Sequence, residues 1–191
     1  MRFFKKSSYL TDEELMQRVH EGNERALEEI YYRYSPLLLK YFHRMLWREE
    51  QKAQDFLHDL FLKIIEHPHR FNPESKFSTW IYSVANNMCK NEYRKIEFRK
   101  SVNGLHSKDL IHFDSIAQQM DHSAFQFDLN KSIERLDHDE KSLFVLRYEL
   151  EKDLDEIARI LDCPEGTVKS KLFYLRKKLS KQLQQHKTIF D

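Results

Sequence analysis

The chain has 191 residues, 40% hydrophobic and 33% charged, with only 3 glycines and 4 prolines. A protein of sheets and turns needs more of both residues, so the composition excludes that class and predicts an all-α fold with one or two small cores. The formal net charge of +1 excludes strong long-range attraction of nucleic acid by the chain as a whole.

Charge is nevertheless distributed unevenly along the chain. Residues 76–100 and 165–191 carry net charges of +4 and +5, whereas residues 1–75 and 101–164 carry −1 and −7. Because phosphate binding depends on local charge, two basic stretches separated by an acidic one suggest two DNA contacts on one chain.

The sequence indicates neither a metal site nor a membrane segment. Cys89 and Cys163 make no disulfide framework and have no zinc-finger partners, so we expect both to be reduced. No apolar run approaches the roughly 18 residues needed to cross a bilayer, and the first residues lack the apolar core of a signal peptide. We expect a cytoplasmic protein without a cofactor.

The first helices are predicted before residue 47. Thr11 and Glu14 have the spacing of a capping box, and the helical stripe that follows is broken at residues 21–23. Ser35 and Pro36 predict a further helix start, because proline suits the first turn of a helix. These segments are expected to open a helical domain and to serve mainly its core.

Residues 51–66 predict an amphipathic helix. Its outer side carries mostly polar and acidic residues, which are Gln54, Asp55, His58, Asp59 and Leu62. That face is either a solvated surface or a docking face for a partner protein. The stretch resembles the sigma-factor helix that grips the clamp coiled coil of RNA polymerase, with Asp55, Asp59 and Phe61 at matching positions. The resemblance implies polymerase binding.

Residues 67–75 form a cluster of helix breakers, in which His67 and His69 are expected to be solvated rather than metal-bound. From residue 76 to 100 a buried stripe predicts a helix that starts near Ser78 or Thr79. Asn86 and Asn87 predict a loop or kink, because amides compete for backbone groups.

A basic tract with one aromatic residue follows this expected bend. Cations along a backbone and a flat surface for an unstacked base are what single-stranded DNA requires, although a solvated basic helix would carry the same residues. The predicted contacts in this tract are Lys90, Asn91, Tyr93 and Arg94.

The runs Phe77–Tyr82, Ala85–Asn87 and Lys90–Asn91, together with Arg94, resemble the promoter-melting segment of extracytoplasmic-function (ECF) sigma factors. That resemblance implies that Asn87 and its neighbours, Asn86 included, form the loop that captures a flipped base of the downstream promoter element, which adds Asn86 and Asn87 to the predicted contacts. It also implies that residues 90–95 touch the non-template strand. The spacing of Trp80 places its side chain in the core, away from DNA.

Residues 101–124 lack a sustained period and are predicted to be a flexible linker between two small helical domains, residues 1–100 and 125–191. The second domain is expected to begin with two helices, the second capped by Asp137 or Asp139. Its acidic surplus argues against a DNA face there.

Residues 153–179 predict a helix-turn-helix. Apolar residues from Leu154 to Leu161 recur at helical spacing, and Pro164 predicts the start of a second helix with a basic, aromatic and hydroxylic outer face. Such a helix fits the major groove, although a plain helical hairpin would also carry solvated lysines. The predicted contacts are Thr167, Lys169, Ser170, Lys171, Phe173, Tyr174, Arg176 and Lys177.

The runs Glu156–Ala158 and Gly166–Leu172 resemble the segment by which sigma factors hold the upstream promoter element, and a related pattern occurs in LuxR-type activators. Three sigma segments in family order identify the chain as an ECF-type sigma factor. The resemblance implies core RNA polymerase and promoter DNA as partners and leaves an anti-sigma factor open. Alternatives are a LuxR-like activator with a non-sigma N-terminal domain and a pure protein-interaction module. No catalytic constellation is present, so we expect no enzyme activity.

Overall fold

A computed structural model describes residues 10–102 and 124–184, and within these ranges every regular element is helical. The N-terminal half (residues 10–102) contains α1 (Asp12–His20), α2 (Glu24–Met45), α3 (Glu50–Glu66), a 3₁₀ turn (Pro68–Arg70) and α4 (Phe77–Val102). The C-terminal half (residues 124–184) contains α5 (Ala124–Glu134), α6 (His138–Phe144), a π-helical turn (Val145–Glu149), α7 (Leu154–Ile160) and α8 (Glu165–Gln182). The all-α prediction is confirmed.

Local sequence signals set several helix boundaries. Thr11 caps α1 in a capping box with Glu14, as the spacing predicted. Asp137, one of the two predicted caps, caps α6 and forms a capping box with Glu140. The break between α1 and α2 is at Gly22, whose φ of +84° is easily adopted only without a Cβ. The second helix of the helix-turn-helix starts directly after Pro164, as expected.

The predicted helix start at Ser35 and Pro36 is wrong, because α2 runs through both residues from Glu24 to Met45. Proline at this point removes one backbone hydrogen bond. Buried side chains on both sides of it, Tyr34 and Leu38, hold the helix against the core. Tertiary packing therefore outweighs the local preference of proline.

The predicted bend at Asn86 and Asn87 is also absent, since α4 is continuous from Phe77 to Val102. The side chain of Asn86 accepts hydrogen bonds from Tyr41 and Ser142 instead of competing for its own backbone. The helix begins one residue before the predicted start, and the Phe77 backbone N–H donates to Glu13 Oε1 on α1 at 2.8 Å. The start of α4 is thus fixed by a residue far away in the sequence.

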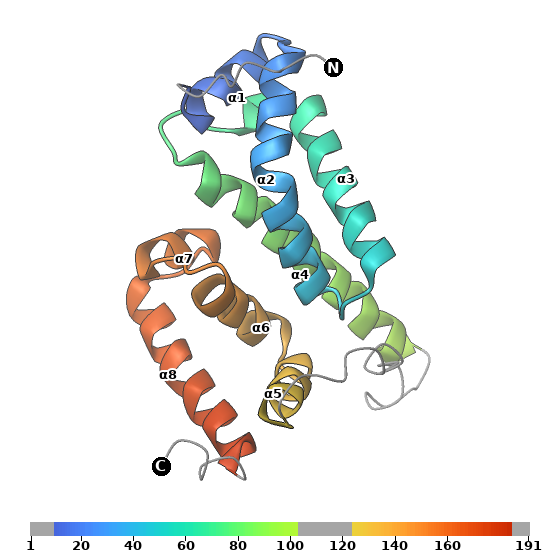
Figure 1. Cartoon of the computed structure of the whole chain (residues 1–191), viewed down its shortest axis with the longest axis vertical. Coiled ribbons are helices and arrows are strands. Elements are labelled where there is room, and N and C mark those ends of the chain that lie inside the picture. Colours follow the sequence, from blue (N-terminus) through green and yellow to red (C-terminus); the bar gives the residue numbers. More distant parts are fainter. Residues whose placement is uncertain (1–9, 103–123, 185–191) are drawn as a thin grey trace.

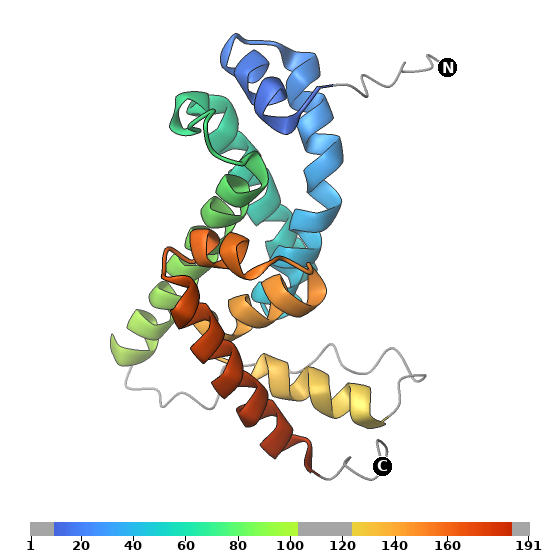
Figure 2. The same ribbon diagram turned by 90° about the vertical axis from the view of Figure 1, so that its left-hand side faces the viewer.

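The halves lie against each other, with α1–α4 forming one group and α5–α8 a second that packs against α4 and the end of α2 (Figure 1). Turned by 90°, α7 is seen across the middle of α4 while α8 runs away from the N-terminal half (Figure 2). The expected linker at 101–124 lies almost wholly outside the described residues. As a result, α4 contacts both halves, whereas among the described residues α8 packs chiefly on α5, α6 and α7 of its own half.

Candidate nucleic-acid and polymerase interfaces

Helix α8 separates its apolar and polar residues cleanly. Val168, Leu172, Leu175 and Leu179 are buried against the C-terminal core. On the opposite side Tyr174 is 67% exposed and Phe173 lies beside it with ring centroids 5.5 Å apart. Of the eight residues predicted to touch the upstream element, seven are exposed and Thr167 is half-buried. Sequence spacing alone was sufficient to predict this surface.

The cations of α8 differ in their surroundings. Lys171 and Lys178 turn toward α6, where they pair with Asp139 at 3.2 Å and Glu140 at 2.5 Å. Lys169 pairs with Glu165 one turn earlier on the same helix. Arg176 and Lys177 form no ion pair within the described residues and are exposed, so they are the cations most readily offered to a phosphate or a guanine edge.

Helix α4 presents two stripes that differ in accessibility. Asn87, Asn91 and Arg94 are exposed on one side. Asn86 is only 5% exposed: its Oδ1 accepts from Ser142 Oγ at 2.8 Å and from the Tyr41 hydroxyl at 3.3 Å. Burial raises the pKa of Tyr41 well above its ordinary value, so this phenol stays protonated and able to donate.

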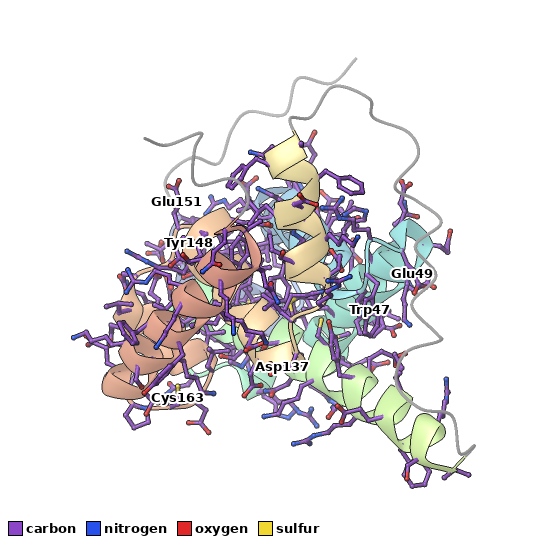
Figure 3. All side chains as sticks on the ribbon, turned by 90° about the horizontal axis from the view of Figure 1, so that it is seen from below. Trp47, Glu49, Asp137, Tyr148, Glu151 and Cys163 are labelled. Carbon is purple, nitrogen blue, oxygen red and sulfur yellow. The ribbon has the colours of Figure 1, made fainter. Side chains whose placement is uncertain are left out.

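Tyr93 belongs to the covered stripe as well. Its hydroxyl donates to the Met45 carbonyl at 2.9 Å, and its ring stacks on Trp47 with centroids 4.5 Å apart. The edge of His138 from α6 meets the same ring. Trp47, labelled in Figure 3, lies on the turn between α2 and α3, beside α4. The six residues predicted to contact the downstream element are thus divided: Asn86 is buried, Lys90 and Tyr93 are half-buried, and Asn87, Asn91 and Arg94 are exposed.

Helix α3 places its predicted polymerase-facing residues on the surface, with one exception. Gln54, Asp55, His58, Asp59 and Leu62 are exposed. Phe61 is only 5% exposed and packs against Tyr31 of α2, with ring centroids 4.7 Å apart. Phe61 therefore belongs to the core and supports the face from beneath.

Exposed apolar side chains extend this α3 face in a way that sequence reasoning missed. Ile65 on α3 is 50% exposed, and Tyr31 on α2, whose ring packs on Phe61 of α3, is 47% exposed. The signal that could have found Tyr31 is its place beside the buried stripe of α2, which does not accommodate the ring fully. An apolar patch beside acidic residues is typical of a protein-binding surface.

Metal and membrane sites are not evident in the part of the chain that the structure describes. His67 and His69 contact each other through their rings, but no group of three metal-ligating side chains occurs among residues 10–102 and 124–184. No helix within those ranges is long and apolar enough to span a membrane. The geometry defines a helical protein that offers a helix-turn-helix, a second basic helix and a separate acidic and apolar face.

Comparison with known proteins identifies that class more closely. Residues 30–99 match the family model of sigma-70 region 2, and residues 126–179 match that of sigma-70 region 4. The chain is 30% identical over 189 residues to the ECF RNA polymerase sigma-E factor of Haemophilus influenzae, a match that covers 92% of this chain and 96% of that protein. It is 28% identical over 188 residues to the RNA polymerase sigma-H factor of Pseudomonas aeruginosa, covering 91% and 94%.

Solved structures share the fold. CnrH in complex with the cytosolic domain of CnrY superposes with a TM-score of 0.65 at 20% identity, covering 91% of this chain and 97% of CnrH. The sigma factor RpoE in complex with the anti-sigma factor NepR from Bartonella quintana gives 0.66 at 20% identity, covering 82% and 96%.

The chain belongs to the ECF sigma factors. It directs promoter-specific initiation of transcription by RNA polymerase, and a LuxR-like activator is not favoured because the N-terminal half matches sigma region 2.

Proposed function

We propose that three separate surfaces of the chain divide the work of initiation. The α3 face, with Gln54, Asp55, His58, Asp59 and Leu62, binds core RNA polymerase. The outer face of α8 holds the upstream element as duplex, and the exposed stripe of α4 contacts the downstream element once its strands part. The exposure of basic and aromatic groups on α8, opposite a fully packed apolar stripe, is the observation that supports this division most directly.

The downstream element is opened by binding and not by a catalysed reaction. Each flipped base loses a few kcal/mol of stacking, and contacts to the base and phosphates offset that cost. Asn87, Asn91 and Arg94 supply amide and guanidinium groups on the exposed side of α4. The continuous helix argues against a base-capturing loop at Asn87, so we assign these residues to the strand as a helical surface.

The chain is accordingly proposed to act by binding, without enzyme chemistry, in the cytoplasm where promoter DNA and polymerase are found. An anti-sigma factor is a proposed further partner, since two structural neighbours were solved with the cytosolic domain of CnrY and with the anti-sigma factor NepR. Leu62 and Ile65, two exposed apolar side chains of α3, offer it a surface that overlaps the polymerase face.

The function is tested by run-off transcription with purified core polymerase on promoters selected from a random library. The wild-type chain is expected to give discrete transcripts. The double variant Asp55→Ala with Asp59→Ala is expected to lose both polymerase binding and transcripts, whereas Glu66→Ala, an exposed carboxylate at the end of the same helix, retains them. Duplex binding without any polymerase-dependent transcript would contradict the proposal.

A further inference from the structure

Helix α8 carries its cations on two opposite edges of its exposed face. Residues seven positions apart in a helix are two turns apart on the same side, so Lys171 and Lys178 share one edge of α8. By the same spacing Lys169 and Arg176 share the other edge, and Ser170 lies between the two. The edge with Lys171 and Lys178 faces α6, which packs beside α8 (Figure 1).

The edges of a recognition helix face phosphates rather than bases. An α-helix with its side chains is about as wide as the major groove, about 12 Å, so its central residues meet base edges and its two edges meet the two phosphate backbones. Contacts to phosphate raise the affinity for every sequence alike, whereas contacts to base edges distinguish one sequence from another. The cations at the edges of α8 therefore decide how much of its binding is independent of sequence.

Two carboxylates of α6 hold both cations of one edge. Lys171 Nζ lies 3.2 Å from Asp139 Oδ2, and Lys178 Nζ lies 2.5 Å from Glu140 Oε2. At the other edge Arg176 is exposed and forms no ion pair within the described residues. Helix α6 thus neutralises one edge of α8 and leaves a free guanidinium group at the other.

Both carboxylates are also fixed by α6 itself. Glu140 Oε2, the oxygen that binds the lysine, accepts the backbone N–H of Asp137 at 3.2 Å in the capping box that begins α6. The second oxygen of Asp139 lies 3.2 Å from His138 Nδ1. Burial opposes ionisation of Asp139, but its hydrogen bonds with His138 and the lysine outweigh burial and lower its pKa. Because both acceptors are already ordered, they lose less conformational entropy on pairing than a freely moving surface carboxylate does.

We propose that Asp139 and Glu140 are specificity-determining residues of the upstream contact, because they keep Lys171 and Lys178 from binding phosphate. Sequence-independent binding by α8 is thereby lowered, and discrimination is left to the centre of its face and to Arg176. Both acids are positioning residues, since they act through the lysines and do not touch DNA. The inference deepens the proposed function and rests on it, because it requires that α8 holds the upstream element as duplex.

The test replaces both carboxylates by neutral isosteres in the full chain, as Asp139→Asn with Glu140→Gln. Glutamine supports a capping box as glutamate does, so α6 keeps its N-terminal cap. The matched control is Glu14→Gln with Glu21→Gln, which removes two exposed carboxylates of α1, far from α8, and likewise retains a capping box (Figure 1). Affinity for a random-sequence duplex of about 30 base pairs is measured without polymerase between about 0.05 and 0.2 M salt.

The α6 double variant is expected to bind the random duplex about tenfold more tightly at about 0.1 M salt. The slope of log K against log salt should become steeper by up to about 1.8, which is about 0.9 for each new phosphate contact. Asp139→Asn and Glu140→Gln are also measured singly, and each should contribute about 0.9. The α1 control should change the affinity by less than about twofold and leave the slope unchanged, because its charges are screened from α8 by salt.

A double-mutant cycle tests whether the gain passes through the lysines. Adding Lys178→Gln to the α6 double variant should remove about 0.9 of the slope, whereas Lys178→Gln alone should change the slope by less than about 0.3. Run-off transcription from a selected promoter then measures specificity itself. With the random duplex as competitor, holoenzyme with the α6 double variant should lose half of its transcripts at about threefold less competitor than the wild type.

Equal gains in the α6 double variant and the α1 control would overturn the inference, because they would mark a general effect of lost negative charge. An unchanged slope in the double variant and in both single variants would overturn it, as would equal effects of Lys178→Gln in the two backgrounds. Wild-type transcripts alongside an unchanged slope leave the sigma-factor roles standing and remove only the role of the two acids. Absent wild-type transcripts remove the sigma-factor roles themselves.

Discussion

Helices α8 and α4 are both basic and are both proposed to contact DNA, yet they differ in what surrounds them. Helix α8 has one buried side and one free side, so its proposed binding residues are those opposite the apolar stripe. Helix α4 is packed against its own half on one side and against the C-terminal half on another. Only its third side, with Asn87, Asn91 and Arg94, is free. The comparison shows that residue type predicts an exposed face well only where a helix is packed on one side.

The largest predicted effect is a loss of stability on replacing Glu134, whose carboxylate lies where the C-terminal half meets the N-terminal half. Lys141 is fully buried, its ammonium group lies 2.7 Å from Glu134, and burial lowers its pKa despite that carboxylate. Glu134→Ala leaves the buried ammonium uncompensated near Arg44 and Arg48, and we expect it to lower the free energy of unfolding by about 3–5 kcal/mol. Urea unfolding followed by circular dichroism measures this. Asp155→Ala, which breaks an exposed pair, should cost less than about 1 kcal/mol; equal losses would contradict the assignment.

On α8 the comparison is sharpened by two cations that face different ways. Arg176→Ala is expected to weaken binding of the upstream duplex by about 1–3 kcal/mol if the guanidinium reads a base, because the exposed group forms no ion pair within the described residues. Lys178→Ala is the control, since its ammonium group pairs with Glu140 on α6. Band-shift titration of polymerase-bound protein measures both. A larger loss for Lys178→Ala would mean that the binding face of α8 lies on the α6 side.

On α4 the two neighbouring asparagines test the exposed and covered stripes separately. Asn87→Ala is expected to lower the yield of open promoter complex by an amount equivalent to about 1 kcal/mol, one lost hydrogen bond, with polymerase binding intact. Asn86→Ala instead removes the acceptor of Ser142 and Tyr41 and is expected to reduce thermal stability first. Permanganate footprinting gives the yield and a melting curve the stability. An unchanged yield with Asn87→Ala would remove the strand contact.

The smallest predicted effect is a pH dependence of the contact between the halves. Burial lowers the pKa of His138, with Asp139 on its own helix opposing that shift, while Lys90 and Tyr93 face the ring from α4. The packed state therefore binds fewer protons than the separated one. Its stability is present above the ordinary histidine pKa, near 6.5, and is lost as pH falls through it, by less than about 1 kcal/mol at pH 6.

Solution scattering at pH 7.5 and pH 6 checks this prediction, with an expanded population expected at the lower pH. His138→Gln should remove the difference, whereas His58→Gln, an exposed histidine on α3, should retain it. Expansion that persists in His138→Gln would assign the pH dependence to another group.

Much of the fold was accessible from local sequence. The capping box at Thr11, the cap at Asp137 and the stripes of α7 and α8 depend on residues a few positions apart, so their spacing was sufficient. What failed depends on partners distant in the chain. Pro36 stays helical because the core holds α2, and α4 begins where Glu13 receives its first N–H. Asn86 stays helical because Ser142 lies opposite.

The predictions of site residues also succeeded or failed according to whether they depend on one helix or on distant neighbours. The α8 surface follows from one helix alone and was predicted residue by residue, pending a binding test. The α4 and α3 sets were predicted from residue type together with the family resemblance, and each includes a member that packing buries: Asn86 on α4 and Phe61 on α3. Tyr93 on α4 is half-buried. A sequence without an alignment carries no signal for which neighbour covers a polar stripe, because that depends on how two halves pack.

The fluorescence of Trp47 can report whether α6 is packed against the N-terminal half. The indole stacks on Tyr93 and has the Lys141 ammonium 5.9 Å from its centroid, so its emission depends on whether α6 is in place. Trp80 is packed among Phe71 and Phe77 inside the N-terminal half, where α6 does not reach it. Departure of α6 should therefore shift the fluorescence of one tryptophan and leave the other as an internal reference, so polymerase docking can be followed in real time without a dye.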